Sequence, residues 1–210
     1  MIAFPTMSFI GYGTGFWIPP SVMRLHEGVS ASEVGLWLGL GGTFGGLLGV
    51  TIGGFLADRF KQRHPAGRLI MLGVAILSFP PFTLWVMHAD NLTTVYIVNV
   101  FSTMFGAAAT SVPPATAADL VLPRMRAIAG AYYILLNTTI GLALGPYCMG
   151  KISDVFVASG MNDGEALRAA IIVSLLILLV SLTFLVLASR SLPADEVSRL
   201  ERARALGEPV

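Results

Sequence analysis

Charged residues are scarce in this sequence. Of its 210 residues only 12% are Asp, Glu, Lys or Arg, whereas 55% are hydrophobic. An ordinary soluble domain carries about 25% charged residues, so the composition excludes that class and indicates an integral membrane protein. The net charge of +1 gives no sign of a nucleic-acid partner.

Cysteine and histidine are almost absent as well. A single cysteine, Cys148, excludes an internal disulfide framework and any cysteine-based metal site. The three histidines, His26, His64 and His88, lie in predicted loops far apart along the chain. We therefore predict neither a metal site nor a cofactor, and a protein that is not an enzyme.

Long uncharged runs divide the chain into six predicted membrane-spanning helices. About 20 apolar residues are enough for a helix to cross the hydrocarbon core of a bilayer. The predicted spans cover approximately residues 4–22, 32–57, 69–87, 93–118, 127–149 and 169–189. They form one transmembrane domain, residues 1–190, followed by a polar tail, residues 191–210, for which both a short amphipathic helix and disorder are open.

Lysine and arginine are distributed unevenly between the loops. Ten of the 13 follow the second, fourth or sixth span, and the other three lie in the opposite loops. By the positive-inside rule, this distribution places both chain ends and the two basic loops in the cytoplasm. The expected location is a bacterial inner membrane.

The second span contains a regular series of glycines. It begins near Ser30, which forms a capping-box pattern with Glu33. Glycine allows close approach of another helix in a membrane, and spacings of three and four residues place a set of glycines on one helix face. We predict that this face packs against a neighbouring helix; its members are Gly35, Gly39, Gly42, Gly46, Gly49 and Gly53.

Polar residues mark one face of the first and fourth spans, whereas the third and sixth spans are almost uniformly apolar. Polar faces in a membrane are expected to contact protein or water, and the apolar spans are expected at the lipid-facing periphery. The order polar, glycine-rich, apolar thus occurs twice. Because the connections are short, the two triplets run in opposite orientations, which favours a 3+3 inverted repeat.

Several motifs in this pattern resemble the major facilitator superfamily. The segment Gly54-Phe55-Leu56-Ala57-Asp58-Arg59, followed by Gly67-Arg68, resembles that family's G-x-L-a-D-R loop motif. Gly141-Leu142-Ala143-Leu144-Gly145-Pro146-Tyr147-Cys148-Met149-Gly150 resembles its G-x-x-x-G-P-x-x-x-G helix pattern. Gly11-Tyr12-Gly13, Trp17-Ile18-Pro19-Pro20 and Pro123-Arg124-Met125-Arg126 resemble the Spinster-like branch more specifically. The resemblance covers the whole chain but only the C-terminal six helices of a twelve-helix transporter.

This resemblance implies a fold and a function. The fold is an all-α, six-helix half of a major-facilitator transporter. The function is secondary active transport, by alternating access, of a small organic or amphipathic, lipid-like substrate. The implied partners are membrane lipids, the substrate, and the missing N-terminal half or a second copy. The alternative is a stand-alone six-helix protein acting as a homodimeric half-transporter or as a non-transporting partner subunit.

Three groups of candidate site residues follow. The resemblance implies a gate in which Asp58 contacts the other half and the two arginines before the fifth span receive the corresponding Asp; for these arginines simple anchoring is the alternative. A hinge or a static kink is expected at the fifth span. The gate group is Gly54, Asp58, Arg59, Arg68, Arg124 and Arg126; the hinge group is Gly141, Gly145 and Pro146.

The third group is the predicted wall of a substrate cavity. Each of its members could instead serve helix packing. No ionisable residue lies near the middle of a predicted span, so any residue that couples transport to an ion is expected outside this chain. The candidates for the wall are Tyr12, Trp17, Asn99, Thr103, Tyr133 and Asn137.

Overall fold

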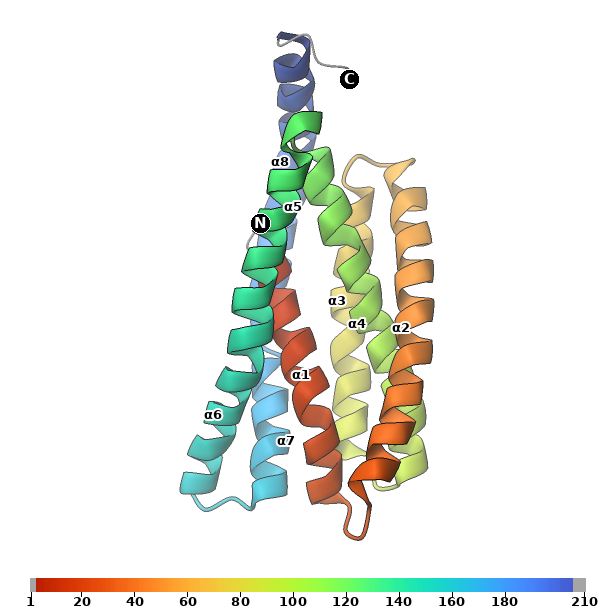
Figure 1. Cartoon of the computed structure of the whole chain (residues 1–210), viewed down its shortest axis with the longest axis vertical. Coiled ribbons are helices and arrows are strands. Elements are labelled where there is room, and N and C mark those ends of the chain that lie inside the picture. Colours follow the sequence, from red (N-terminus) through yellow and green to blue (C-terminus); the bar gives the residue numbers. More distant parts are fainter. Residues whose placement is uncertain (1–2, 206–210) are drawn as a thin grey trace.

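The computed structural model describes residues 3–205, and every regular element in that range is helical. The long helices run side by side along the long axis of the molecule (Figure 1). In chain order the elements are α1 (Ala3–Leu25), α2 (Ala31–Lys61), α3 (Gly67–His88), α4 (Leu92–Asp119), the 3₁₀ turn η1 (Pro123–Met125), α5 (Arg126–Leu136), the π-helical segment η2 (Asn137–Leu144), α6 (Gly145–Ala158), α7 (Asp163–Ser174) and α8 (Ile177–Ala205).

Five of the described helical segments are long and apolar enough to cross a membrane. They are Ala31–Lys61, Gly67–His88, Leu92–Asp119, Arg126–Ala158 and Asp163–Ser191. The all-α membrane fold class is thereby confirmed. By composition α1 is less apolar because it contains glycines, hydroxyl residues and the pair Pro19-Pro20, and its role as a sixth span stays a prediction.

The fifth and sixth rods differ most from the spans expected from the sequence. The fifth rod, made of α5, η2 and α6, continues past residue 149 to Ala158, because Lys151 and Asp154 lie on an exposed face where a charge does not end a helix. The sixth rod is interrupted at Leu175 and Leu176 without a proline or glycine. After this break α8 continues to Ala205 and so includes residues 191–205 of the predicted tail. Residues 206–210 lie outside the described part.

Side chains at the helix starts satisfy the first free backbone N–H groups. Ser30 Oγ accepts from the backbone N–H of Glu33 at 3.2 Å, as the capping-box pattern predicts. Asn91 and Asn162 cap α4 and α7 in the same way, at 2.8 and 2.9 Å. The helices α2, α4 and α7 therefore each begin at a residue defined by its cap.

The helices form two groups, and each group contains the first helix of the other triplet. Helix α4 packs mainly against α2 and α3, whereas α1 packs mainly against η2, α6, α7 and α8. In Figure 1, α1 and α4 lie between α2 on one side and the α5–α6 rod on the other. In both groups a glycine-bearing second helix contacts the first helix of the other triplet.

The packed glycine face of α2 differs from the predicted one. A Cβ atom at Gly45 would lie 2.4 Å from the carbonyl oxygen of Val100, and one at Gly49 would lie 2.1 Å from that of Met104. Gly41 and Gly53 extend this row along α4. By contrast, nothing lies within 4 Å of a Cβ at the four remaining predicted positions, Gly35, Gly39, Gly42 and Gly46.

The helix geometry explains this correction. Residues four apart advance about 40° around a helix, so the row from Gly41 to Gly53 winds obliquely across α2. Packing along such a row is typical of close glycine-mediated contacts between membrane helices. The predicted face joins the contact only at Gly49 and Gly53. Three of its other members, Gly35, Gly39 and Gly42, line the cavity described below.

The two apolar rods are only partly peripheral. Leu72 and Ile76 of α3, and Leu167 and Ile171 of α7, are almost fully buried in the two hydrophobic cores. The opposite faces carry exposed apolar residues, including Leu77, Leu176 and Leu179. Each rod therefore packs with one side and leaves the other side open to lipid.

Candidate functional site

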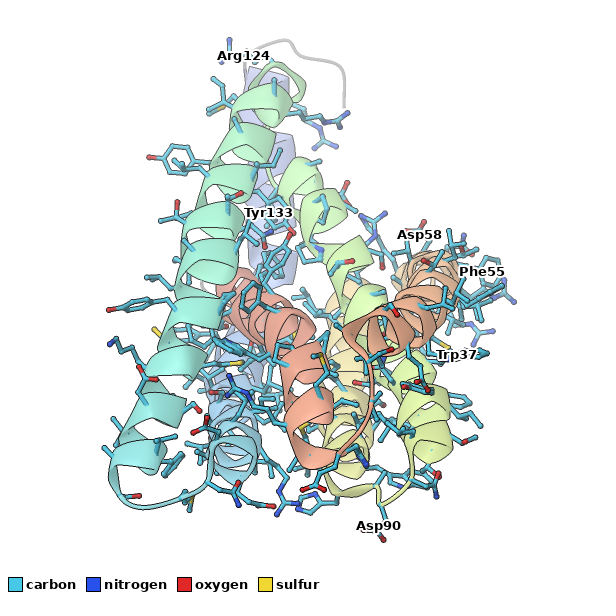
Figure 2. All side chains as sticks on the ribbon, turned by 60° about the horizontal axis from the view of Figure 1, so that its bottom comes forward. Trp37, Phe55, Asp58, Asp90, Arg124 and Tyr133 are labelled. Carbon is cyan, nitrogen blue, oxygen red and sulfur yellow. The ribbon has the colours of Figure 1, made fainter. Side chains whose placement is uncertain are left out.

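A cavity of about 650 Å³ lies between α1, α2, α4 and the α5–η2 segment. Five of the six candidate wall residues line it: Tyr12, Asn99, Thr103, Tyr133 and Asn137. Figure 2 shows Tyr133 on α5, pointing towards the space between α5 and α4. The described lining contains no Asp, Glu, Lys, Arg or His side chain.

The wall formed by α1 and η2 is internally hydrogen-bonded. Ser8 Oγ donates to Oδ1 of Asn137, and Nδ2 of Asn137 donates to the hydroxyl oxygen of Tyr12 at 3.5 Å. A Cβ at Gly141 would lie 2.7 Å from that of Ser8. The absence of a side chain at Gly141 thus lets η2 approach α1 closely enough for Asn137 to reach both partners.

The wall formed by α4 is arranged differently. Ser102 also lines the cavity, and its hydroxyl group shares a hydrogen bond of 2.8 Å with the hydroxyl group of Thr83 of α3. Asn99 is only 6% exposed, and its carboxamide has no hydrogen-bond partner among the described residues. Thr103 lies one turn further along the same face and lines the same cavity.

Trp17 is not part of the described lining, in contrast to its predicted position in the cavity wall. Its indole N–H donates to the carbonyl oxygen of Pro146 at 2.7 Å, and its ring lies against Gly150, where a Cβ would come within 2.9 Å. Trp17 therefore fixes α1 against α6. The alternative assigned to each candidate, helix packing, describes this residue.

The predicted hinge lies where the rod widens into η2. Pro146 has no backbone N–H, so the carbonyl four residues before it lacks its usual partner, and the turns that precede it are π-helical. Gly141 and Gly145 are buried against α1; a Cβ at Gly145 would lie 2.4 Å from the carbonyl oxygen of Phe9. The kink is thus part of a tightly packed contact, and motion at this place stays a prediction.

Asp58 and Arg68 of the gate motif belong to a four-residue ion-pair cluster where α2 ends, α3 begins and α4 ends. Arg68 donates from Nε and Nη2 to Oδ1 of Asp58, at 3.0 and 2.7 Å. Its Nη1 also donates to Oδ2 of Asp119, which in addition pairs with Lys61. Arg68 is the most buried of the four side chains, at 18% exposed.

Sequence reasoning missed Asp119 and Lys61. Asp119 ends the uncharged run of α4 on the same side of the predicted membrane as Arg68, and Lys61 follows Asp58 after three residues. Both positions were therefore visible as charges near the ends of predicted spans. The pairing itself depends on the contact between α3 and α4, which no local pattern reveals.

The three remaining arginines of the gate group lie at the surface. Arg59 is exposed near the end of α2, and Phe55 points away from the bundle (Figure 2). Gly54 is half-buried, and a Cβ there would lie 3.9 Å from that of Ser111 of α4. Arg124 and Arg126 are exposed at the start of the α5 rod, and Figure 2 shows Arg124 well apart from Asp58. The structure thus does not bring these arginines to Asp58 of the same chain.

Comparison with known proteins identifies the family. The Major Facilitator Superfamily model matches residues 1–208, and the chain belongs to this superfamily of transporters, which is not a family of enzymes. An MFS-type efflux pump of Mycolicibacterium smegmatis is 32% identical over 149 residues, covering 70% of this chain and 34% of the pump. Protein spinster of Drosophila melanogaster is 26% identical over 164 residues, covering 73% of this chain and 27% of that protein.

Solved structures agree with this assignment. A bacterial homolog of the human lysosomal transporter Spinster, in an inward-facing and occupied conformation, matches with a TM-score of 0.76 and 24% identity, over 92% of this chain and 49% of the homolog. The xylose transporter XylE from E. coli matches with a TM-score of 0.62 and 17% identity, over 97% of this chain and 52% of XylE. The chain is therefore Spinster-like, and it spans about half the length of these transporters.

Proposed function

We propose that this chain is the C-terminal six-helix half of a secondary transporter that moves a small organic or amphipathic molecule across a bacterial inner membrane by alternating access. The observation that carries the proposal is the uncharged cavity between α1, α2, α4 and α5. A cavity of this size, with apolar walls and a few polar groups, is typical of a small-molecule site.

The comparisons support the same function. The efflux pump of M. smegmatis and the bacterial homolog of Spinster are transporters by name, and this chain covers about a third of the first and half of the second. The other wall of the cavity would then come from a further six helices or from a second copy of the chain.

The orientation follows from the charges. The connections that carry Arg59, Lys61, Arg63 and Arg68, and then Arg124 and Arg126, lie at the same end of the bundle as the end of α8 (Figure 1). We assign this end to the cytoplasm because basic residues are retained there. The ion-pair cluster of Asp58, Lys61, Arg68 and Asp119 then lies at the cytoplasmic gate.

The test is efflux of Nile red, a neutral fluorescent amphiphile, from preloaded bacterial cells. One strain expresses this chain alone, and another expresses it together with the coding DNA upstream of Met1. Efflux that requires the upstream sequence supports a C-terminal half, whereas efflux by the chain alone supports a homodimeric half-transporter.

A matched pair of variants completes the test. Asn137→Leu should reduce the efflux rate without reducing the amount of protein in the membrane, whereas Thr183→Val, on the exposed face of α8, should leave the rate unchanged. No efflux above an empty-vector control in either strain would contradict the proposal for amphiphiles of this class.

A further inference from the structure

Asn99 differs in its hydrogen bonding from Asn137, the other asparagine of the described cavity lining. It is 6% exposed and lines the cavity, and its carboxamide has no partner in the described part of the chain. Its polar atoms are not among the buried atoms that lack a partner in the described part, so water in the cavity reaches them, and a ligand that displaces this water has to replace its hydrogen bonds. Here the cavity is the side from which that partner can come.

The neighbouring polar groups do not supply one. On the opposite wall Asn137 already has Ser8 and Tyr12 as partners, and on α4 itself Ser102 is paired with Thr83. Thr103, one turn from Asn99, likewise has no hydrogen bond within the described residues. Asn99 and Thr103 thus present two unused polar groups on one face of α4.

The chemistry of the complementary group follows from these two side chains. A carboxamide offers both N–H donors and a carbonyl acceptor, and a hydroxyl offers one of each. The described lining contributes no charge, so an ionic group placed here would lose its hydration without gaining a counter-ion. The favoured group is therefore neutral and carries a donor and an acceptor together.

We infer that Asn99, with Thr103, is the specificity-determining contact of this half, and that it binds a neutral hydroxyl or amide group of an amphipathic substrate. The apolar part of the substrate then lies against apolar lining residues such as Met7, Ile18, Leu38 and Phe79. This inference rests on the proposed transport function and specifies the substrate class of the same cavity.

The experiment measures binding to the transport unit purified through a tag on this chain, together with whatever half or copy it retains. Three radiolabelled probes with the same chain length are compared in nanodiscs by scintillation proximity. They are decanamide, a neutral donor and acceptor; methyl decanoate, an acceptor only; and decyltrimethylammonium, a cation. Excess unlabelled probe corrects for partition into lipid.

We expect the wild type to bind decanamide about tenfold more tightly than methyl decanoate. Asn99→Leu should remove this preference by weakening decanamide alone, and Thr103→Val, which keeps the side-chain shape, should reduce it several-fold. Asn99→Asp should shift the preference towards decyltrimethylammonium, because it replaces the donor by a negative charge. Thr183→Val on the exposed face of α8 should bind as the wild type does.

The outcomes separate this inference from the proposed function. Saturable binding without a preference for decanamide, or a preference that persists in the Asn99 and Thr103 variants, overturns the inference and leaves the binding cavity in place. No saturable binding of any probe to the wild type overturns both. If Asn99→Leu fails to fold, the near-isosteric variants Asn99→Asp and Thr103→Val decide the question.

Discussion

The contact between α2 and α4 makes a quantitative prediction for Gly49. Non-bonded heavy atoms are in ordinary contact from about 3.5 Å, and a Cβ at Gly49 would lie 2.1 Å from the carbonyl oxygen of Met104 and 2.9 Å from Cβ of Ala107. The neighbours are backbone and a short side chain, which cannot rotate away. Gly49→Ala therefore requires the two helices to separate locally by more than about 1 Å.

Such overpacking costs about 1–3 kcal/mol. The higher helix propensity of alanine offsets up to about 1 kcal/mol in water, and less in micelles, where unfolded membrane proteins keep much of their helix. Gly46→Ala is the matched control, because it adds the same methyl group three residues away with nothing within 4 Å. The expected destabilisation is confined to Gly49→Ala.

The assay is equilibrium unfolding of the purified chain in mixed micelles with an increasing fraction of sodium dodecyl sulfate, followed by tryptophan fluorescence. Gly49→Ala should unfold at a lower fraction of dodecyl sulfate than the wild type, by a free energy of about 1–3 kcal/mol. Gly46→Ala should unfold at the wild-type midpoint or above it. Equal midpoints for the two variants would refute the close packing of Gly49 against α4.

Two further predictions use the same unfolding assay. Asp119→Asn should lower the free energy of unfolding by about 1–3 kcal/mol, because it removes the negative charge that pairs with the mostly buried Arg68. Asp58→Asn, at a carboxylate that is 64% exposed, should cost less than about 1 kcal/mol; equal effects would contradict this ranking. Trp17→Phe removes the donor to the Pro146 carbonyl and should cost about 1 kcal/mol while leaving decanamide binding unchanged, and a loss of binding would return Trp17 to the cavity wall.

The sequence predicted those features of the fold that depend on local composition. Uncharged runs located the helical rods, and the capping residue Ser30 marks the beginning of the second one. The polar faces of the first and fourth spans also indicated residues that line the cavity. In each case the signal is the chemistry of one segment against lipid or water, which does not depend on the neighbouring helices.

Features that depend on contacts between helices were predicted less well. The glycines of the second span share a face by periodicity, but only the crossing of α2 and α4 selects Gly41 and Gly45 for the contact. Trp17 resembles a cavity aromatic in sequence and becomes a packing residue because Gly150 and Pro146 lie beside it. The break at Leu175 has no proline or glycine to announce it.

Asn99 and Asn137 show the same limit within the candidate site. Both are asparagines on polar helix faces, and the sequence gives no reason to separate them. Their difference arises because Gly141 allows α1 to come close, which supplies Ser8 and Tyr12 as partners for Asn137. No described side chain is a hydrogen-bond partner of Asn99, and by our inference its carboxamide binds a ligand instead.

The ion-pair cluster distinguishes a fixed contact from an exchangeable one. Arg68 is mostly buried and has two acceptors, Asp58 and Asp119, on different helices. If a cation or a helix N-terminus from the other half attracts Asp58, Arg68 keeps Asp119, so no buried charge is left unpaired. Because Asp58 is largely exposed, its own exchange of partners involves little desolvation. At the proposed gate, Asp58 can therefore leave Arg68 and pair with another group, while the pair of Arg68 with Asp119 keeps the contact between α3 and α4.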